Sequence, residues 1–344
     1  MPPQSPGHQH HMKTKQMHSM LVAISLSVIS AEAQEQPGAA SHIVSEAGAS
    51  MFALSNALAQ ADWAARDEAE GRLVALGKDA IPLLLERAKT DEGTPAFRQD
   101  RVRAIAKSDG GGEASTRALI DLTLTARDTN VALAAGGWLS NRRINFPLTQ
   151  EQVTGLVSRI GGDNLSAAAG VARALARATN VDKRVIAAPV VELLARAIRE
   201  NRGRTNSPTR GSYVSSEVLH LDGFLTPFSD IGFDAVGPYL REKLGAARAA
   251  GDARMSFWLT IAIGHSGDRS VAESLLKVVQ STNEDSSLRA AALAAYASAL
   301  KQDAIPILEQ YTSDSTSGPD PRHPPIAMIA KRELAFLLRA NPKR

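Results

Sequence analysis

Apolar residues recur at helical spacing from about residue 44 to the end of the chain. Around a polar turn at Lys78-Asp79 the apolar set is Leu73, Leu76, Ile81, Leu84 and Leu85. Residues three or four apart share one face of a helix, so this pattern predicts two amphipathic helices joined by a short turn. A similar sequence recurs at 288–311. The tripeptide Ala-Ile-Pro begins at Ala80 in the first copy and at Ala304 in the second.

The predicted starts of the second helices recur at a regular interval. They fall at Pro82, Thr116, Gln152, Pro189, Pro238, Ala272 and Pro306. The steps are 34, 36, 37, 49, 34 and 34 residues, and the long step becomes 35 without the 14 residues 201–214. Proline is tolerated in the first turn of a helix, so the four prolines are expected to mark helix starts. A period near 35 predicts an array of about seven helical hairpins.

Shorter helical patterns are expected to close the array at both ends. The N-terminal pattern comprises Val44, Ala47, Met51, Leu54 and Leu58, and the C-terminal one comprises Ile326, Ile329, Leu334, Leu337 and Leu338. Lys331, Arg332 and Arg339 are expected to keep the outer side of the last helix polar, as the end of a stack requires. The prediction is an all-α superhelix over residues 44–341, with capping half repeats and a loop insertion at 201–214.

The N-terminal region carries the pattern of a targeting segment. Lys13 and Lys15 precede a short apolar stretch, and Ala31-Glu32-Ala33 supplies a small-x-small cleavage pattern. The apolar stretch is shorter than the ~20 residues that span a bilayer. Residues 1–33 are therefore interpreted as a leader and cleavable signal peptide, and 34–43 as a linker. Cleavage after Ala33 would give a periplasmic or secreted protein without stable membrane insertion.

Composition narrows the functional classes. The 344 residues are 44% hydrophobic but only 4% aromatic, which suits thin stacked layers better than one large core. The chain has no cysteine, so disulfides, cysteine-ligated metals and a cysteine nucleophile are excluded. The formal charge of +3 includes no long basic run, which argues against nucleic acid as a partner.

Two stretches resemble HEAT repeats, in particular the short bacterial type also called PBS-lyase HEAT-like repeats. They are RLVALGKDAIPLLLERA and LTIAIGHSGDRSVAESLLKVV, and the second contains the Gly-x-x-Gly-Asp turn as Gly264 to Asp268. The resemblance covers roughly 45–340 and is weaker where GGGE and FPLTQEQ replace the usual turn. It implies an α-α superhelix whose second helices line a concave surface that binds partners. No lyase motif accompanies it.

Candidate catalytic groups have simpler structural explanations. His220 and Asp222 could form a metal-binding or acid–base pair, but residues two apart on a helix point to different sides. His265, Ser266 and Asp268 lie in one tight turn, where serine and aspartate are common caps. The glycines 110–112 follow no strand and precede no Lys-Ser/Thr, so they do not form a phosphate-binding loop. No cofactor or metal is predicted.

Candidate partner-binding residues lie where the repeat is broken. Arg202, Arg204, Arg210 and Tyr213 belong to the insertion, and arginine and tyrosine are common in interfaces. The alternative is a solvated loop. Arg142 and Arg143, in a turn of the third unit, form a second, weaker set. Trp63, Trp138 and Trp258 are expected to be packing residues rather than a ligand-binding patch.

The expected function is that of a non-enzymatic exported scaffold. It would bind a protein partner, whose identity the sequence does not give, through the concave face and the insertion. The alternatives are an enzyme or enzyme-accessory subunit with a site near His220 and Asp222, and a binder of an envelope polyanion or glycan. The sequence does not determine the oligomeric state.

Overall fold

The computed structural model describes residues 51, 53–56, 58, 63–90, 95–202, 213–314 and 326–340. At residues 63, 95–97, 201–202, 213–220 and 222 only the backbone is described. The predicted leader, the linker and most of the N-terminal capping helix lie outside these ranges. Residues 47–344 form one compact unit, and its described part consists of helices and their connections, without strands.

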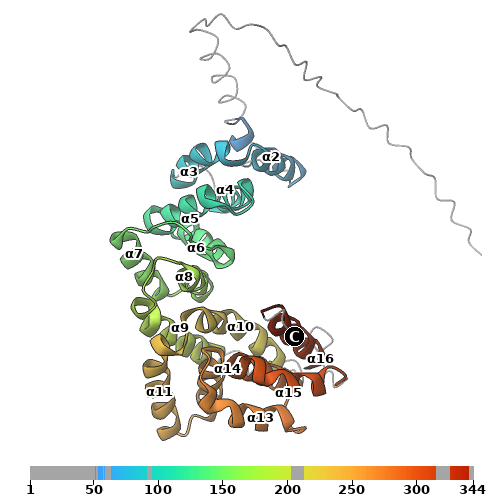
Figure 1. The fold of residues 1–344 in the computed structure, drawn as a ribbon. Coiled ribbons are helices and arrows are strands. Elements are labelled where there is room, and N and C mark those ends of the chain that lie inside the picture. The colour runs from blue at the N-terminus through green and yellow to red at the C-terminus, as the bar shows by residue number, and fades with distance from the viewer. Residues whose placement is uncertain are drawn as a thin grey trace, which may run out of the picture. The chain divides into compact units, whose positions relative to one another are not determined.

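Seven helical hairpins follow one another along this unit (Figure 1). Their first helices are α2 (Trp63–Ala75), α4 (Pro95–Ser108), α6 (Thr129–Trp138), α8 (Leu165–Arg177), α10 (Tyr213–Ile231), α12 (Ala253–His265) and α14 (Ser286–Leu300). Their second helices are α3 (Ile81–Lys89), α5 (Glu113–Thr125), α7 (Gln150–Ile160), α9 (Arg184–Arg202), α11 (Phe233–Ala249), α13 (Ala272–Gln280) and α15 (Ile305–Tyr311). The helix α16 (Ile326–Ala340) follows. The prediction of an all-α stack of seven hairpins and a closing half repeat is confirmed.

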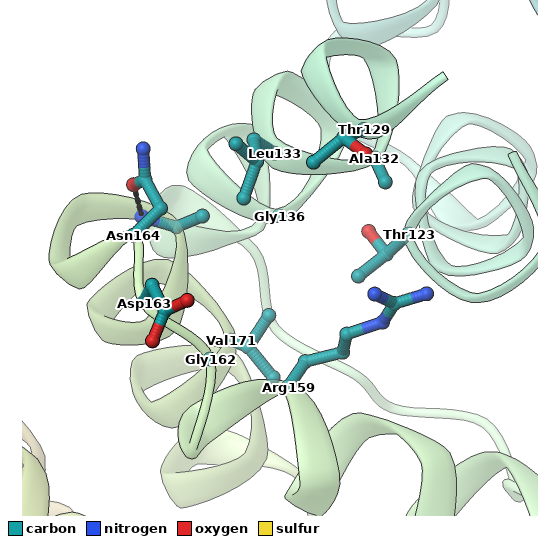
Figure 2. A pocket seen from close by; sticks show the side chains of 11 residues that line it. Thr123, Thr129, Ala132, Leu133, Gly136, Arg159, Gly162, Asp163, Asn164 and Val171 are labelled. Carbon is teal, nitrogen blue, oxygen red and sulfur yellow. Dashed lines mark hydrogen bonds between the residues drawn. The ribbon is translucent and has the colours of Figure 1, made fainter. Parts of the chain in front are cut away.

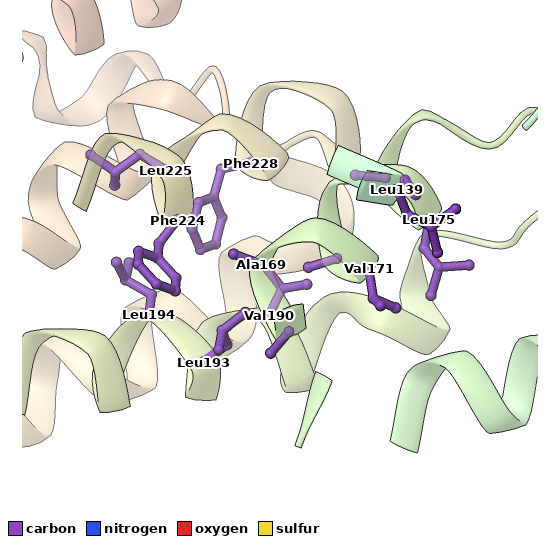
Figure 3. Close-up of a cluster of buried hydrophobic side chains, with 14 of the residues drawn as sticks. Leu139, Ala169, Val171, Leu175, Val190, Leu193, Leu194, Phe224, Leu225 and Phe228 are labelled. Atoms are coloured by element: carbon purple, nitrogen blue, oxygen red, sulfur yellow. The ribbon is translucent and has the colours of Figure 1, made fainter. Parts of the chain in front are cut away.

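The hairpins stack in two layers. Each first helix packs on the first helix of the next hairpin from α2 to α14, and α14 packs on α16. The second helices α3, α5, α7, α9 and α11 pack on one another in the same way. Figure 3 shows buried side chains of α8, α9 and α10 gathering between the layers, among them Val171, Leu194 and Phe224. Burying such side chains between repeats is what holds the stack together.

The C-terminal end of the stack bends toward its first helices. Helix α10 packs on α14 as well as on α12, although α12 lies between them in the sequence. The second helices α11, α13 and α15 pack on first helices, but α11 and α13, and α13 and α15, are not among the closely packed pairs. Because the first helices are crowded and the second helices are spread, first helices form the inner side of this bend. The family resemblance implied second helices on a concave side.

Two of the four prolines mark helix starts as predicted. Pro82 and Pro306 lie in the first turn of α3 and α15, each after one turn of 3-10 helix, η1 (Gly77–Ala80) and η4 (Lys301–Ala304). The prediction is wrong for Pro189 and Pro238, which lie inside α9 and α11. Both helices begin five residues earlier, at Arg184 and Phe233, so each proline removes one backbone donor from the second turn.

Two predicted core leucines are also exposed. Leu76 is 42% exposed at the turn after α2, and Leu338 is 45% exposed on α16. The periodicity places each on the edge of its apolar stripe, where no neighbouring helix covers it in the described chain.

Candidate functional site

Polar side chains join neighbouring hairpins at the period of the repeat. Examples are Arg66 to Asp100 at 3.2 Å, 34 residues apart, and the Gln302 amide, which donates to the Leu337 carbonyl at 2.9 Å, 35 apart. Two contacts span the insertion instead, and their partners are 50 and 53 residues apart, from Arg173 to Gly223 and from Arg177 to Asp230. Many charged groups are therefore used to hold the hairpins together.

Glu70 is the most deeply buried carboxylate among these contacts. It is 4% exposed and accepts hydrogen bonds from Arg103 Nε at 2.6 Å and from Lys107 Nζ at 2.7 Å. Burial acts to raise its pKa, but the hydrogen bonds and charges of Arg103 and Lys107 outweigh burial and hold the pKa below its ordinary value. Glu70 thus links α2 to α4 as an ionised group.

Arg142, a predicted partner-binding residue, is buried between hairpins. Only 7% of it is exposed, and its guanidinium donates to the carbonyl of Ala106. Burial lowers the pKa of Arg142, and the nearby carboxylate of Asp109 opposes that effect. Asp109 itself accepts from the Gly112 amide at 2.8 Å and the Ser115 amide at 3.0 Å. This placement does not fit contact with a partner from the surface.

The other predicted partner-binding residues are placed differently. Arg143 is exposed, because residues 141–147 alternate between inward and outward positions. Arg202 ends α9 and Tyr213 begins α10, so the insertion joins two hairpins. The side chains of Arg202 and Tyr213, and all of Arg204 and Arg210, lie outside the described residues. Of the two predicted sets, only Arg142 and Arg143 therefore have described side chains.

One hollow lies between the second, third and fourth hairpins (Figure 2). Its volume is about 440 Å³. Leu133, Gly136 and Val171 give it apolar walls, while Arg159 and Asp163 reach into it from the end of α7 and the turn that follows. Arg159 also donates to the Leu124 carbonyl at 3.3 Å. Arg159 and Asp163 are exposed, while Thr123 is buried and its hydroxyl donates to the Leu119 carbonyl.

A larger hollow lies on the inner side of the bend, where α10, α12 and α14 end beside α16. Its volume is about 660 Å³, within the ~300–1,000 Å³ range of ligand pockets. Lys301, Ser298 and His265 line one part of it, and Phe336, which is 68% exposed, lines another. We call this cavity the terminal hollow.

The charges of the terminal hollow are nearly balanced once ion pairs are considered. Its carboxylates are those of Asp230, Asp234 and Glu333. Asp230 pairs with Arg177 at 3.2 Å, and Glu333 pairs with Arg332 at 2.7 Å. Within the described chain, Asp234 and Lys301 form no ion pair. Among the described residues, Lys301 is thus the one lysine or arginine that lines the hollow, and its ammonium remains available to a ligand.

Lys301 occupies a position that favours glycine. It is the one non-glycine residue with positive φ in the described chain, at φ 54°. When the two Ala-Ile-Pro sequences are aligned, Lys301 corresponds to Gly77, which has φ 63°. One repeat of 34 residues earlier, Lys301 corresponds to Gly267, which has φ 98°. The turn before these second helices therefore needs a left-handed residue, which costs an L-residue about 1–2 kcal/mol. The repeat period alone did not predict this residue, although the alignment of 288–311 with the first hairpin places a lysine where Gly77 stands.

The remaining sequence candidates are separated by the fold. The Ser266 hydroxyl donates to the Ile263 carbonyl at 2.7 Å, and Asp268 accepts from the Ser270 amide at 2.9 Å and from Arg241 at 3.0 Å. His265 Nδ1 lies 3.5 Å from the Ser298 hydroxyl. These groups therefore do not assemble as a triad.

Other predicted features have packing roles or are not described. Trp258 is 1% exposed, as predicted for a packing residue. Trp138 is half-buried, and the side chains of Trp63, His220 and Asp222 are outside the description. Among the described residues, no three His, Asp or Glu side chains gather as a metal site, and no helix is long and apolar enough to cross a membrane.

Comparison with known proteins adds little to this picture. No protein-family model matches the sequence, and no curated protein matches it either. Among solved structures, human deoxyhypusine hydroxylase in complex with glycerol is 12% identical, with a TM-score of 0.28. That match covers 88% of this chain and 99% of the hydroxylase chain. A likeness at this level says nothing about activity, so the architecture rests on the helices and contacts described above.

Proposed function

We propose that this chain is a non-enzymatic, exported scaffold of the HEAT-like class that binds a protein partner. The observation that supports it is the surface of α16. A helix that ends a repeat stack is expected to be polar on its outer side. Yet Met328 is 54% exposed, Phe336 is 68% exposed and Leu338 is 45% exposed on this one helix. Exposed apolar groups gathered on one element favour contact with another macromolecule.

The fold supplies a suitable base for such contacts. Stacked hairpins present a long series of side chains on rigid helices, and several part-buried charged groups join one hairpin to the next. The insertion at 201–214, with Arg202, Arg204, Arg210 and Tyr213, and the exposed Arg143 are further contact candidates. Arg142 is not part of this proposal because it is buried.

The test is co-purification after cross-linking in the cell envelope. One variant changes Met328, Phe336 and Leu338 together to serine. Its matched control changes Val185 and Tyr239, which are 45% and 40% exposed, on other helices. We expect the α16 variant to lose a specific cross-linked protein that the wild type and the control retain.

Two further measurements address the alternatives. Substitution of His220 or Asp222 should leave partner capture unchanged, and a hydrolase or lyase activity abolished by either substitution would contradict the proposal. Binding that disappears at modestly raised salt would favour the polyanion alternative, because screening weakens exposed charge contacts. Export itself predicts a mature chain that begins at Gln34, which mass spectrometry of the secreted protein would detect.

A further inference from the structure

Lys301 combines an unfavourable backbone with a placement that suits ligand binding. The aligned turns use Gly77 and Gly267 where the chain must be left-handed, and Lys301 adopts the same sign of φ at 54°. A glycine at this position would relieve the strain. Strained residues of this kind are concentrated at binding and catalytic sites, where function maintains an unfavourable conformation.

The surroundings of Lys301 indicate what kind of group it would contact. Lys301 is exposed, lines the terminal hollow and has no carboxylate partner within the described chain. Asp230 and Glu333, which share the hollow, are already paired with Arg177 and Arg332. Asp234, the third carboxylate of the lining, forms no ion pair with Lys301 in the described chain, so a ligand carboxylate would find the ammonium without an ion-pair partner.

Polar and apolar groups near Lys301 narrow the ligand further. The Ser298 hydroxyl and the His265 ring lie in the same hollow, 3.5 Å from each other, and provide hydrogen-bonding groups. Phe336 exposes 68% of its surface at the hollow and offers a large apolar contact. The set matches a carboxylate attached to an apolar body better than a free inorganic anion.

We propose that the terminal hollow binds an acidic, partly apolar segment of the protein partner, with the Lys301 ammonium contacting a carboxylate of that segment and Phe336 packing on its apolar side chains. This inference rests on the proposed scaffold function and specifies the chemistry of the partner.

Three substitutions at one position separate charge from strain. Lys301→Arg keeps both the charge and the strained backbone. Lys301→Met keeps the strain and removes the charge. Lys301→Gly removes both, and we expect it to raise the melting temperature by about 2–4 °C, since it restores the residue found at Gly77 and Gly267. Equal melting temperatures for the glycine and methionine variants would contradict the strain argument.

The binding probe is the capped peptide Ac-Leu-Glu-Leu-Glu-Leu-amide, titrated into the full chain and followed by calorimetry or NMR. Its control replaces both glutamates with glutamine. We expect the glutamate peptide to bind wild type and Lys301→Arg alike, and to bind Lys301→Met and Lys301→Gly about tenfold more weakly. Phe336→Ala should weaken binding too, while Met328→Ala, on the same helix outside the hollow, should not.

Several outcomes would overturn the inference. They are the absence of binding to wild type, equal binding of the two peptides, and equal binding to Lys301→Met. Self-association that the peptide disrupts would assign the hollow to a second copy of the chain. If the peptide does not bind but the α16 serine variant still loses its cross-linked partner, the result contradicts only this inference and not the scaffold function. Peptide binding through Lys301 without any cross-linked partner would contradict the scaffold function instead.

Discussion

The guanidinium of Arg142 lies against the backbone of Gly111, in the space that a β-carbon at position 111 would fill. Gly111 also has φ 91°, a left-handed conformation that disfavours other residues. Gly111 thus makes room for a buried arginine from the next hairpin. That arrangement connects the second and third hairpins through the Ala106 carbonyl.

This relationship predicts different effects for two adjacent glycines. Gly111→Ala should lower the free energy of unfolding by about 3 kcal/mol, because it adds backbone strain and displaces Arg142 from its acceptor. Gly110→Ala is the control, since its φ is 63° but its β-carbon would meet no atom within 4 Å. It should cost only about 1 kcal/mol. Urea unfolding of both variants measures the difference, and equal losses would contradict the role given to Arg142.

Adjacent arginines should likewise separate stability from binding. Arg142→Met leaves the buried Ala106 carbonyl without its donor and should destabilise the fold by about 2 kcal/mol. Arg143→Ala, at an exposed position, should change stability by no more than about 0.5 kcal/mol. Of the two variants, we expect only Arg143→Ala to capture less of the partner, when both are measured in the folded state. A stable Arg142→Met that lost its partner would reverse this assignment.

Glu70 predicts a pH-dependent contribution to stability. Its pKa is lower in the folded protein than the ordinary value of 4.5. Its contribution is therefore complete above the ordinary value and is lost as the pH falls through the lower folded-state pKa. Glu70→Gln should lower the free energy of unfolding by about 2 kcal/mol at pH 7 and progressively less in acid. Glu273→Gln, at an exposed pair with Lys277, should show little effect at any pH, and a parallel pH profile for the two variants would refute the prediction.

The close approach of α6 and α8 gives a further prediction. A β-carbon on Gly170 would overlap the Gly136 carbonyl, so Gly170→Ala must push two helices apart. We expect a loss of about 1–3 kcal/mol, as for other overpacked sites. Gly245→Ala in α11 meets no atom within 4 Å and should stabilise its helix by up to about 1 kcal/mol. Calorimetric melting temperatures should move in opposite directions, and a shift of the same sign would exclude this packing.

Periodicity was sufficient to predict the hairpins because burial between repeats follows helical spacing. All seven predicted second-helix marks fall within second helices. The errors at Pro189 and Pro238 have one cause, because each helix begins about one turn before its proline and the proline rule does not show that extra turn. Leu76 and Leu338 were predicted to be in the core from their helical spacing alone. Spacing does not show whether a neighbouring helix covers a residue at the edge of an apolar stripe.

The site residues were harder to predict because their surroundings come from other hairpins. Arg142 is buried through contacts with residues more than 30 positions earlier, so its own turn gives no sign of burial. Lys301 looks like an ordinary turn lysine until the strain at its backbone is compared with Gly77. The terminal hollow depends on the bend that brings α10 against α14, and no local pattern encodes that bend.

The polar contacts spaced by one repeat have a consequence for how this protein can change in evolution. Each joins only adjacent hairpins, so the duplication or deletion of a whole hairpin would change polar contacts at its two borders and leave those of the other hairpins as they are. The contacts across 201–214 show the same tolerance on a smaller scale, since their partners are 50 and 53 positions apart and still meet. The effect of a change in array length would thus stay local, whereas the strained turn at Lys301 is specific to this end.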